Sequence, residues 1–164
     1  YQIGYVGDAW QALQAAFPKD YNNPLLEEAG LVIDKEGKRY DRFRDRLMFP
    51  IRNPSGQVIG FGGRILDKGE PKYLNSPETP LFHKGRELHG LFEAKAAIKQ
   101  NERVLVVEGY MDVVALAQHG VAYAVATLGT ATSADHIKTL LRHSDKLYFC
   151  FDGDSAGHKA AWRA

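Results

Sequence analysis

The feature that most constrains the fold is a regular alternation of elements in the last third of the 164-residue chain. Apolar runs of strand length alternate there with stretches of helical periodicity, which gives strands at 103–107, 121–128 and 146–151 and helices at 110–119, 133–143 and 155–163. This order predicts an α/β fold, an open parallel sheet wound on both sides by helices. The unbroken apolar run from Val104 to Val107 is typical of a strand buried on both faces. In the helix that follows, we expect Met111, Val114 and Ala115 to face inward.

The first hundred residues have a mixed α+β pattern instead. Helices are expected near 8–17, 24–29 and 91–100, and strands at 31–33, 46–51 and 58–65. Asn53-Pro54-Ser55-Gly56 predicts a hairpin turn, and the three prolines of 71–84 predict a long loop that is either ordered or functional. We therefore expect a basic N-terminal subdomain over 1–101 and a parallel-sheet subdomain over 102–164. Because the chain starts at Tyr1 and stops inside a predicted helix, we interpret it as a fragment that is incomplete at its C-terminus.

The composition excludes several classes of protein. With 45% hydrophobic and 25% charged residues the chain is neither disordered nor fibrous. No apolar run reaches the roughly 18 residues that a membrane helix needs. A single cysteine, Cys150, excludes both an intramolecular disulfide framework and a cysteine-rich zinc site. We expect Cys150 to be buried as a small hydrophobic residue and the protein to be cytoplasmic, with no membrane partner.

The net charge of +1 hides a strongly basic block. Residues 1–34 carry a net charge of −4, whereas residues 35–72 carry ten Lys and Arg against five Asp and Glu. The ten cations are Lys35, Lys38, Arg39, Arg42, Arg44, Arg46, Arg52, Arg64, Lys68 and Lys72. Aromatic residues lie between them, which is the pattern of a surface for single-stranded nucleic acid. Charge alone favours a solvated face with ordinary core aromatics, so the block by itself does not establish binding.

Three common site signatures are missing from the sequence. The glycines at 60, 62 and 63 do not follow the GxGxxG pattern, and no helix follows them, so we expect close backbone approach in a sheet there. The six histidines have no metal-ligand spacing, and we expect them to be structural or on the surface. No Ser-His-Asp order and no GxSxG motif appears, so a hydrolytic triad has no support.

Acidic residues follow the first and third predicted parallel strands directly. Glu108 ends the first strand, Asp152 and Asp154 end the third, and Asp112 lies one helical turn after Glu108. Parallel sheets bind ligands beyond the carboxyl ends of their strands, and in strand order 2-1-3 these two strands are neighbours. Converging carboxylates need a cation, and oxygen ligands favour Mg²⁺. Any one of these acids is more often a helix cap or a strand end, but together they favour a metal site for phosphoryl transfer.

These strand ends resemble a Toprim domain, which primases, topoisomerases and some nucleases share. The matching stretches are Glu108-Gly109-Tyr110-Met111-Asp112, Leu128-Gly129-Thr130 and Asp152-Gly153-Asp154. Earlier stretches distinguish among these proteins, because in the same order they resemble the bacterial DnaG-type DNA primases: Tyr40 to Ile51, Gly60 to Arg64, Pro71 to Thr79 and Phe82 to Gly85. The resemblance runs over nearly the whole chain and implies the central RNA-polymerase domain of that family.

The resemblance implies a DNA-dependent RNA polymerase that makes short RNA primers on single-stranded DNA for replication. It implies that Glu108, Asp152 and Asp154 are the catalytic acids, and that they hold the catalytic Mg²⁺ together with Asp112. Mn²⁺ is expected to substitute for Mg²⁺. The residues expected to bind the DNA template and ribonucleoside triphosphates are Arg64, Lys72, Tyr73, Asn75 and Lys84, with Arg42, Arg44 and Arg46 beside them.

The resemblance also implies parts that this sequence does not contain. The family's zinc-binding domain precedes this region, so zinc is expected only there, and its last acidic motif and its domain for the replicative helicase follow. We therefore expect weak or no primer synthesis from the fragment alone. Two alternatives stay open. One is a Toprim nuclease or topoisomerase that cleaves phosphodiesters, and the other is a catalytically inert module that binds single-stranded nucleic acid.

Overall fold

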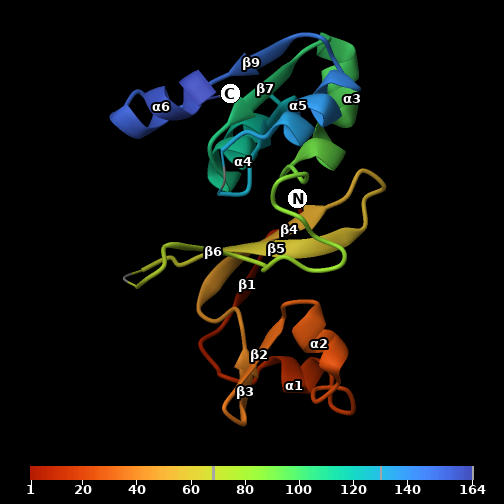
Figure 1. Cartoon of the computed structure of the whole chain (residues 1–164), viewed down its shortest axis with the longest axis vertical. Coiled ribbons are helices and arrows are strands. Elements are labelled where there is room, and N and C mark those ends of the chain that lie inside the picture. The colour runs from red at the N-terminus through yellow and green to blue at the C-terminus, as the bar shows by residue number, and fades with distance from the viewer. Residues whose placement is uncertain (68, 130, 164) are drawn as a thin grey trace. The chain divides into compact units, whose positions relative to one another are not determined.

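The computed structural model describes residues 1–67, 69–129 and 131–163, and its contacts form two compact units (Figure 1). The N-terminal unit comprises Gln2–Pro50 and Ile59–Phe82. The C-terminal unit comprises Tyr1, Ile51–Val58 and the residues from His83 onward. A boundary between subdomains near residue 101 stays a prediction.

A four-stranded sheet forms the middle of the N-terminal unit, in the order β1-β4-β5-β6. Its strands are β1 (Gly4–Val6), β4 (Arg46–Arg52), β5 (Val58–Arg64) and β6 (Tyr73–Asn75). The predicted strands at 46–51 and 58–65 are confirmed. The three glycines lie in β5, and side chains fill the space beside Gly63, because a Cβ there would lie 2.9 Å from Arg46 Cδ. Strand β6 lies inside the stretch that we expected to be a loop throughout.

The rest of the N-terminal unit is a small layer of two helices and a hairpin. It consists of α1 (Leu13–Ala16), α2 (Pro24–Glu28), β2 (Val32–Lys35) and β3 (Lys38–Asp41). The Asn23 side chain caps α2 by accepting from the Leu25 N–H at 3.0 Å. Helix α1 is much shorter than the predicted 8–17, because the backbone N–H of Asp41 donates to the Trp10 carbonyl and holds that segment in a turn. A core of Tyr21, Leu26 and Val32 closes the layer.

The C-terminal unit is built on a three-stranded parallel sheet in the order β8-β7-β9. The strands are β7 (Val104–Val107), β8 (Ala124–Ala126) and β9 (Leu147–Phe149), so the order is the 2-1-3 arrangement that the argument for an acidic site assumed. The helices are α3 (Leu91–Asn101), α4 (Tyr110–Gln118), α5 (Ala134–Leu141) and α6 (Ser155–Arg163). Residues of α3 and α5 pack with Val104, Val106 and Val125 in one core cluster, whereas α4 packs through Val113 against Val107. The sheet therefore has helices on both faces, as an α/β fold requires.

The expectation about which residues of α4 face inward is wrong. In α4 the buried residues are Tyr110 and Val113, and not Met111, Val114 and Ala115. The helix is apolar nearly all round, so its sequence does not mark one inward face.

Cys150 is exposed and not buried. It directly follows β9, an edge strand, and the alternation of that strand continues past its end: Tyr148 and Cys150 are exposed, whereas Phe149 and Phe151 are half-buried. In the part of the chain that the structure describes, every helix is too short or too polar to cross a bilayer.

Candidate functional site

The parallel pairing of β7 and β9 brings two of the predicted acids together. Val106 pairs with Phe149, and Glu108 and Asp152 follow at the same carboxyl edge of the sheet. The backbone N–H of Asp152 donates to Glu108 Oε1 at 2.9 Å, and both residues are exposed. Together with Asp112 they line a cavity of about 300 Å³. Acids from two strand ends and one helix thus line the same cavity.

Asp112 and Asp154 each cap a helix. Asp112 Oδ2 accepts from the Gly109 N–H at 2.9 Å at the start of α4. Asp154 Oδ1 accepts from the Gly157 N–H at 2.8 Å in the first turn of α6, and Asp154 does not line the cavity that the other three acids share. These two hydrogen bonds support the capping interpretation for both acids.

The donors at this edge are of the kind that Mg²⁺ prefers, since all four predicted ligands are carboxylates. The first turn of α6 lies close to them, because a Cβ on Gly157 would be 2.9 Å from Glu108 Oε1 and 2.1 Å from the Asp152 carbonyl oxygen. Among the residues that the structure describes, no three His, Cys, Asp or Glu side chains gather closely enough to hold a metal ion. The type of donor fits the expected cation, but the described side chains do not form a closed metal site. Metal binding by these acids is therefore a proposal.

A second cavity, of about 400 Å³, shares Glu108 with the first. Its other lining residues include Thr127, Thr132, Lys159 and Arg163. Two cations and two hydroxyls beside a carboxylate suit the oxygens of a phosphate group. We had not singled out Lys159 and Arg163 from the sequence. They lie four residues apart on α6, so they share one face of the helix that follows Asp152-Gly153-Asp154. That spacing could have indicated them from the sequence as phosphate-binding candidates.

Strands β5 and β6 carry several of the predicted nucleic-acid residues in register. Arg64 pairs with Tyr73, and its guanidinium carbon lies 5.7 Å from the centre of the Tyr73 ring. Asn75 pairs with Gly62 two residues further along the ladder, and Lys72 precedes β6 on the surface. The structure therefore brings Arg64, Lys72, Tyr73 and Asn75 to one part of the N-terminal unit.

Arg42, Arg46 and Arg64 each have part of the guanidinium group buried. Arg46 is only 6% exposed, and burial together with the nearby Arg44 cation lowers its pKa. Burial likewise lowers the pKa of Arg42. Within the described part of the chain, Arg42 Nε, Arg46 Nη1 and Arg64 Nε are buried with no hydrogen-bond partner. A buried N–H without a partner destabilises a protein, because burial removes hydration that nothing replaces.

Arg44 lies against an aromatic surface that we did not predict. Its guanidinium carbon is 4.0 Å from the centre of the Trp10 ring and 5.2 Å from that of Tyr40, and Arg44 also donates to the Asp41 carbonyl. Trp10 is 63% exposed. An exposed indole beside a guanidinium is a surface on which a nucleobase can stack.

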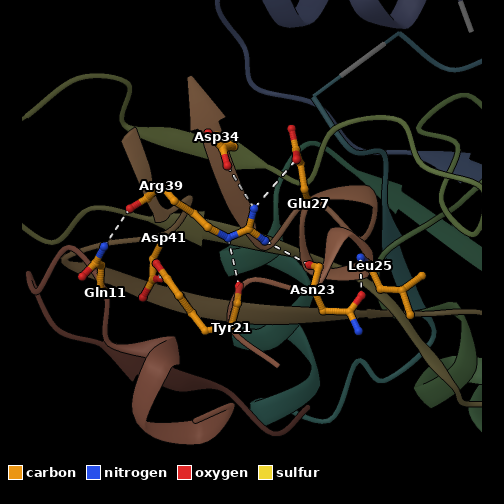
Figure 2. Close-up of polar contacts among 8 residues, drawn as sticks. All are labelled: Gln11, Tyr21, Asn23, Leu25, Glu27, Asp34, Arg39 and Asp41. Carbon is orange, nitrogen blue, oxygen red and sulfur yellow. Dashed lines mark hydrogen bonds and ion pairs between the residues drawn. The ribbon is translucent and has the colours of Figure 1, made fainter. Parts of the chain in front are cut away.

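Two arginines of the basic block are held in structural contacts. Figure 2 shows the Arg39 guanidinium donating to the carbonyl oxygens of Tyr21 and Asn23, at 2.9 and 3.0 Å, and pairing with Asp34 at 3.3 Å. Arg52 pairs with Glu93 at 3.4 Å and donates to the Gly56 carbonyl. These two side chains stabilise the fold. Lys68 and Thr130, which the sequence argument also named, lie outside the described residues.

Lys84 belongs to the C-terminal unit and is half-buried in a turn that precedes α3. Backbone N–H groups of Arg86 and Glu87 both donate to the His83 carbonyl, at 2.9 and 3.1 Å, and close this turn. The sequence predicted Lys84 as a binding residue but did not show which contacts would hold its backbone.

Comparison with protein families supports the resemblance on which these residues were chosen. Residues 1–95 match the DNA primase catalytic core, N-terminal domain, and residues 102–164 match the Toprim domain. A DNA primase of Neisseria meningitidis is 66% identical over 164 residues, which is 100% of this chain and 28% of that protein. The DNA primase of Escherichia coli K12 is 54% identical over 166 residues, which covers 29% of its length. The chain thus spans less than a third of these relatives.

Solved structures agree in fold. A DNA primase domain from Pseudomonas aeruginosa superposes with a TM-score of 0.92 at 55% identity, over 99% of this chain and 51% of that one. A DnaG primase catalytic domain bound to single-stranded DNA gives 0.90 at 53% identity, over 98% of this chain and 50% of that one. With a family match over more than half of its residues, the chain belongs to the family of the DNA primase catalytic core, N-terminal domain, and continues into a Toprim domain.

Proposed function

We propose that this chain works in a DNA primase as the part that binds template and carries acids for nucleotidyl transfer. The observation that carries the proposal is the placing of Glu108 and Asp152 side by side at the carboxyl edge of β7 and β9. In the proposed reaction the 3′-hydroxyl of a primer attacks the α-phosphate of a ribonucleoside triphosphate. A new phosphodiester forms, pyrophosphate leaves, and the hydroxyl loses its proton.

The acids have distinct parts in this scheme. Primases with a Toprim domain depend on metal ions in general, and Glu108, Asp112, Asp152 and Asp154 would hold Mg²⁺, with Mn²⁺ able to replace it. Bound Mg²⁺ would supply charge neutralisation at the triphosphate. Glu108 would also accept the hydroxyl proton. Lys159 and Arg163, which share a cavity with Glu108, would bind phosphate oxygens.

The N-terminal unit would bind the single-stranded DNA template. A related catalytic domain has been solved with single-stranded DNA bound. Arg42, Arg46 and Arg64 would contribute positive charge that attracts the backbone phosphates. Trp10, beside Arg44, would give an exposed aromatic surface for a base.

The remaining partners follow from the family and are part of the same proposal. Ribonucleoside triphosphates are the substrates, and the replicative helicase is the partner of a domain outside this sequence. Zinc is expected only in a separate N-terminal domain. A cytoplasmic location suits a replication protein and is proposed with the function.

The test measures primer synthesis on single-stranded DNA by a full-length family primase that carries this chain in place of its matching segment. Glu108→Gln and Asp152→Asn should each lower synthesis by at least about a hundredfold while leaving the unfolding transition unchanged. Asp145→Asn, the same acid-to-amide change at an exposed residue away from the site, should retain full synthesis. Normal synthesis by a folded Glu108→Gln protein would overturn the assignment.

Two further results of this assay would favour other functions. Mg²⁺-dependent cleavage of labelled DNA, with no primer made, would indicate a nuclease or topoisomerase. Binding of single-stranded DNA without any turnover would indicate an inert binding module.

A further inference from the structure

The turn that contains Lys84 is bound to the N-terminus of α5 through its backbone carbonyls. His136 Nε2 lies 3.0 Å from the Lys84 carbonyl oxygen and 3.1 Å from that of Glu87. The Ser133 hydroxyl donates to the Gly85 carbonyl at 2.6 Å. Three carbonyl groups of one short turn therefore bond to two side chains that lie about fifty residues further along the chain.

The same two side chains cap α5. Ser133 Oγ accepts from the His136 N–H at 3.0 Å, and the Ser133 N–H donates to His136 Nδ1 at 3.1 Å. Because an N–H can only donate, Nδ1 carries no proton, and because carbonyls only accept, Nε2 carries one. The imidazole is thus held as one neutral tautomer, and His136 is fully buried.

A histidine has a specific advantage at this position. The third helical residue of a capping box needs only an acceptor, which Glu or Gln usually supplies. Here the residue must accept from the helix on one side and donate to the Lys84 turn on the other. A neutral imidazole does both across one rigid ring, whereas a carboxylate cannot donate.

We infer that His136 and Ser133 are positioning residues that hold the Lys84 turn so that the Lys84 ammonium meets a phosphate of the template or the nucleotide. This inference deepens the proposed function and rests on it, because that function gives Lys84 its phosphate. The ion pair of Arg86 with Asp135, at 3.7 Å, joins the same two segments at the surface. Neither His136 nor Ser133 touches the ligand itself.

The experiment compares four variants of the chain: Lys84→Ala, His136→Asn, His136→Gln and the double variant Lys84→Ala/His136→Asn. Asparagine can accept from the Ser133 N–H but does not reach the turn carbonyls, whereas glutamine places an N–H near the position of Nε2. Affinity is measured for two probes, a fluorescently labelled oligothymidylate and GTP with Mg²⁺. Amide hydrogen exchange of residues 83–87 and the unfolding transition are recorded for each variant.

We expect Lys84→Ala to weaken one probe about threefold or more and, for DNA, to reduce the salt dependence by about one phosphate contact. His136→Asn should weaken the same probe by a similar factor and speed exchange in 83–87, and His136→Gln should recover most of both. The double variant should bind no more weakly than Lys84→Ala, because His136 acts through Lys84.

Additive losses in the double variant would overturn the inference, as would faster exchange with unchanged affinity in His136→Asn. If His136→Asn does not fold, Ser133→Ala removes the bond to Gly85 and tests the same contact. Should Lys84→Ala leave both probes unaffected, then the phosphate role of Lys84 itself fails, and this single variant shows that failure separately.

Discussion

At the scale of single residues, Asp41 is a buried carboxylate with a partner for each oxygen. It is 1% exposed, and it accepts from the Tyr21 hydroxyl at 3.0 Å and from the Leu13 N–H at 2.8 Å. Figure 2 shows Asp41 beside Tyr21 and Arg39. Burial and this hydrogen bond raise the pKa of Tyr21 to about 12. The carboxylate thus joins α1, the segment before α2, and β3.

We predict that Asp41→Ala lowers the free energy of unfolding by about 2–4 kcal/mol, because it leaves a buried hydroxyl and a buried N–H without an acceptor. Tyr21→Phe, which removes only one donor, should cost about 1 kcal/mol. Urea unfolding measures both. The exposed Asp34→Ala is the matched control and should cost less than about 1 kcal/mol, and an equal loss in that control would contradict the argument.

The buried histidines predict how stability depends on pH. Burial lowers the pKa of His89 to about 4 and also lowers that of His136. In the unfolded chain a histidine titrates near 6.5, so below that pH the unfolded state binds more protons than the folded one. Stability is therefore full above about pH 6.5 and is lost as the pH falls toward 4, with about 3 kcal/mol from His89.

Urea unfolding across this range checks the prediction. His89→Gln, which cannot titrate, should flatten the decline relative to the unaltered chain. The comparison is needed because burial raises the pKa of Glu87, which acts in the opposite direction. Parallel pH profiles for the two proteins would show that His89 does not contribute.

At the scale of elements, Gly30, which follows α2, packs closely against Pro77 in the proline-rich stretch 71–84. Gly30 has a φ of +70°, and a Cβ there would lie 2.4 Å from the ring of Pro77. Gly37 has a similar φ of +73°, but nothing lies within 4 Å of its Cβ position. The two positions therefore separate the cost of backbone conformation from that of steric overlap.

We predict that Gly37→Ala costs about 1 kcal/mol, because only the left-handed backbone opposes it. Gly30→Ala should cost about 3 kcal/mol, since the overlap with Pro77 adds to the same backbone term. Thermal or urea unfolding of the two variants gives the difference directly. Equal costs would mean that the Pro77 segment moves aside freely.

Elements with a strong hydrophobic period were predictable, and short ones were not. The parallel strands and the helix pattern of the C-terminal unit follow from apolar runs and caps such as Ser133. Strand β3 has the sequence Lys38-Arg39-Tyr40-Asp41, which is mostly charged, and it forms because it pairs with β2. Strand β6 exists because Tyr73 to Asn75 pair with β5. Such pairing is not visible in the local sequence.

At the scale of the whole molecule, the basic block contains two kinds of cation: some are held in structural contacts, and others are candidates for binding phosphate. Arg39 and Arg52 are used in the fold, whereas Arg64 has a buried N–H with no partner in the described part of the chain. If Arg64 binds a phosphate of single-stranded DNA, its removal releases fewer counterions on binding.

We predict that Arg64→Ala weakens binding of single-stranded DNA and reduces the slope of log affinity against log salt by about 0.7. Fluorescence anisotropy over a salt series measures the slope. Lys19→Ala removes an exposed cation from the same unit and should leave the slope nearly unchanged. An identical slope for Arg64→Ala and the unaltered chain would exclude a phosphate contact.

The sequence by itself determined the α/β class and the acids at the ends of the predicted strands, because apolar periodicity reports burial and marks where each strand stops. The strand order that makes β7 and β9 neighbours came from the pairing in the structure. The tertiary structure alone decided three things. It placed Arg39 in structural hydrogen bonds, exposed Trp10 beside Arg44, and joined His136 to the Lys84 turn. Each depends on contacts between residues distant in sequence, and neither residue type nor local spacing specifies such contacts.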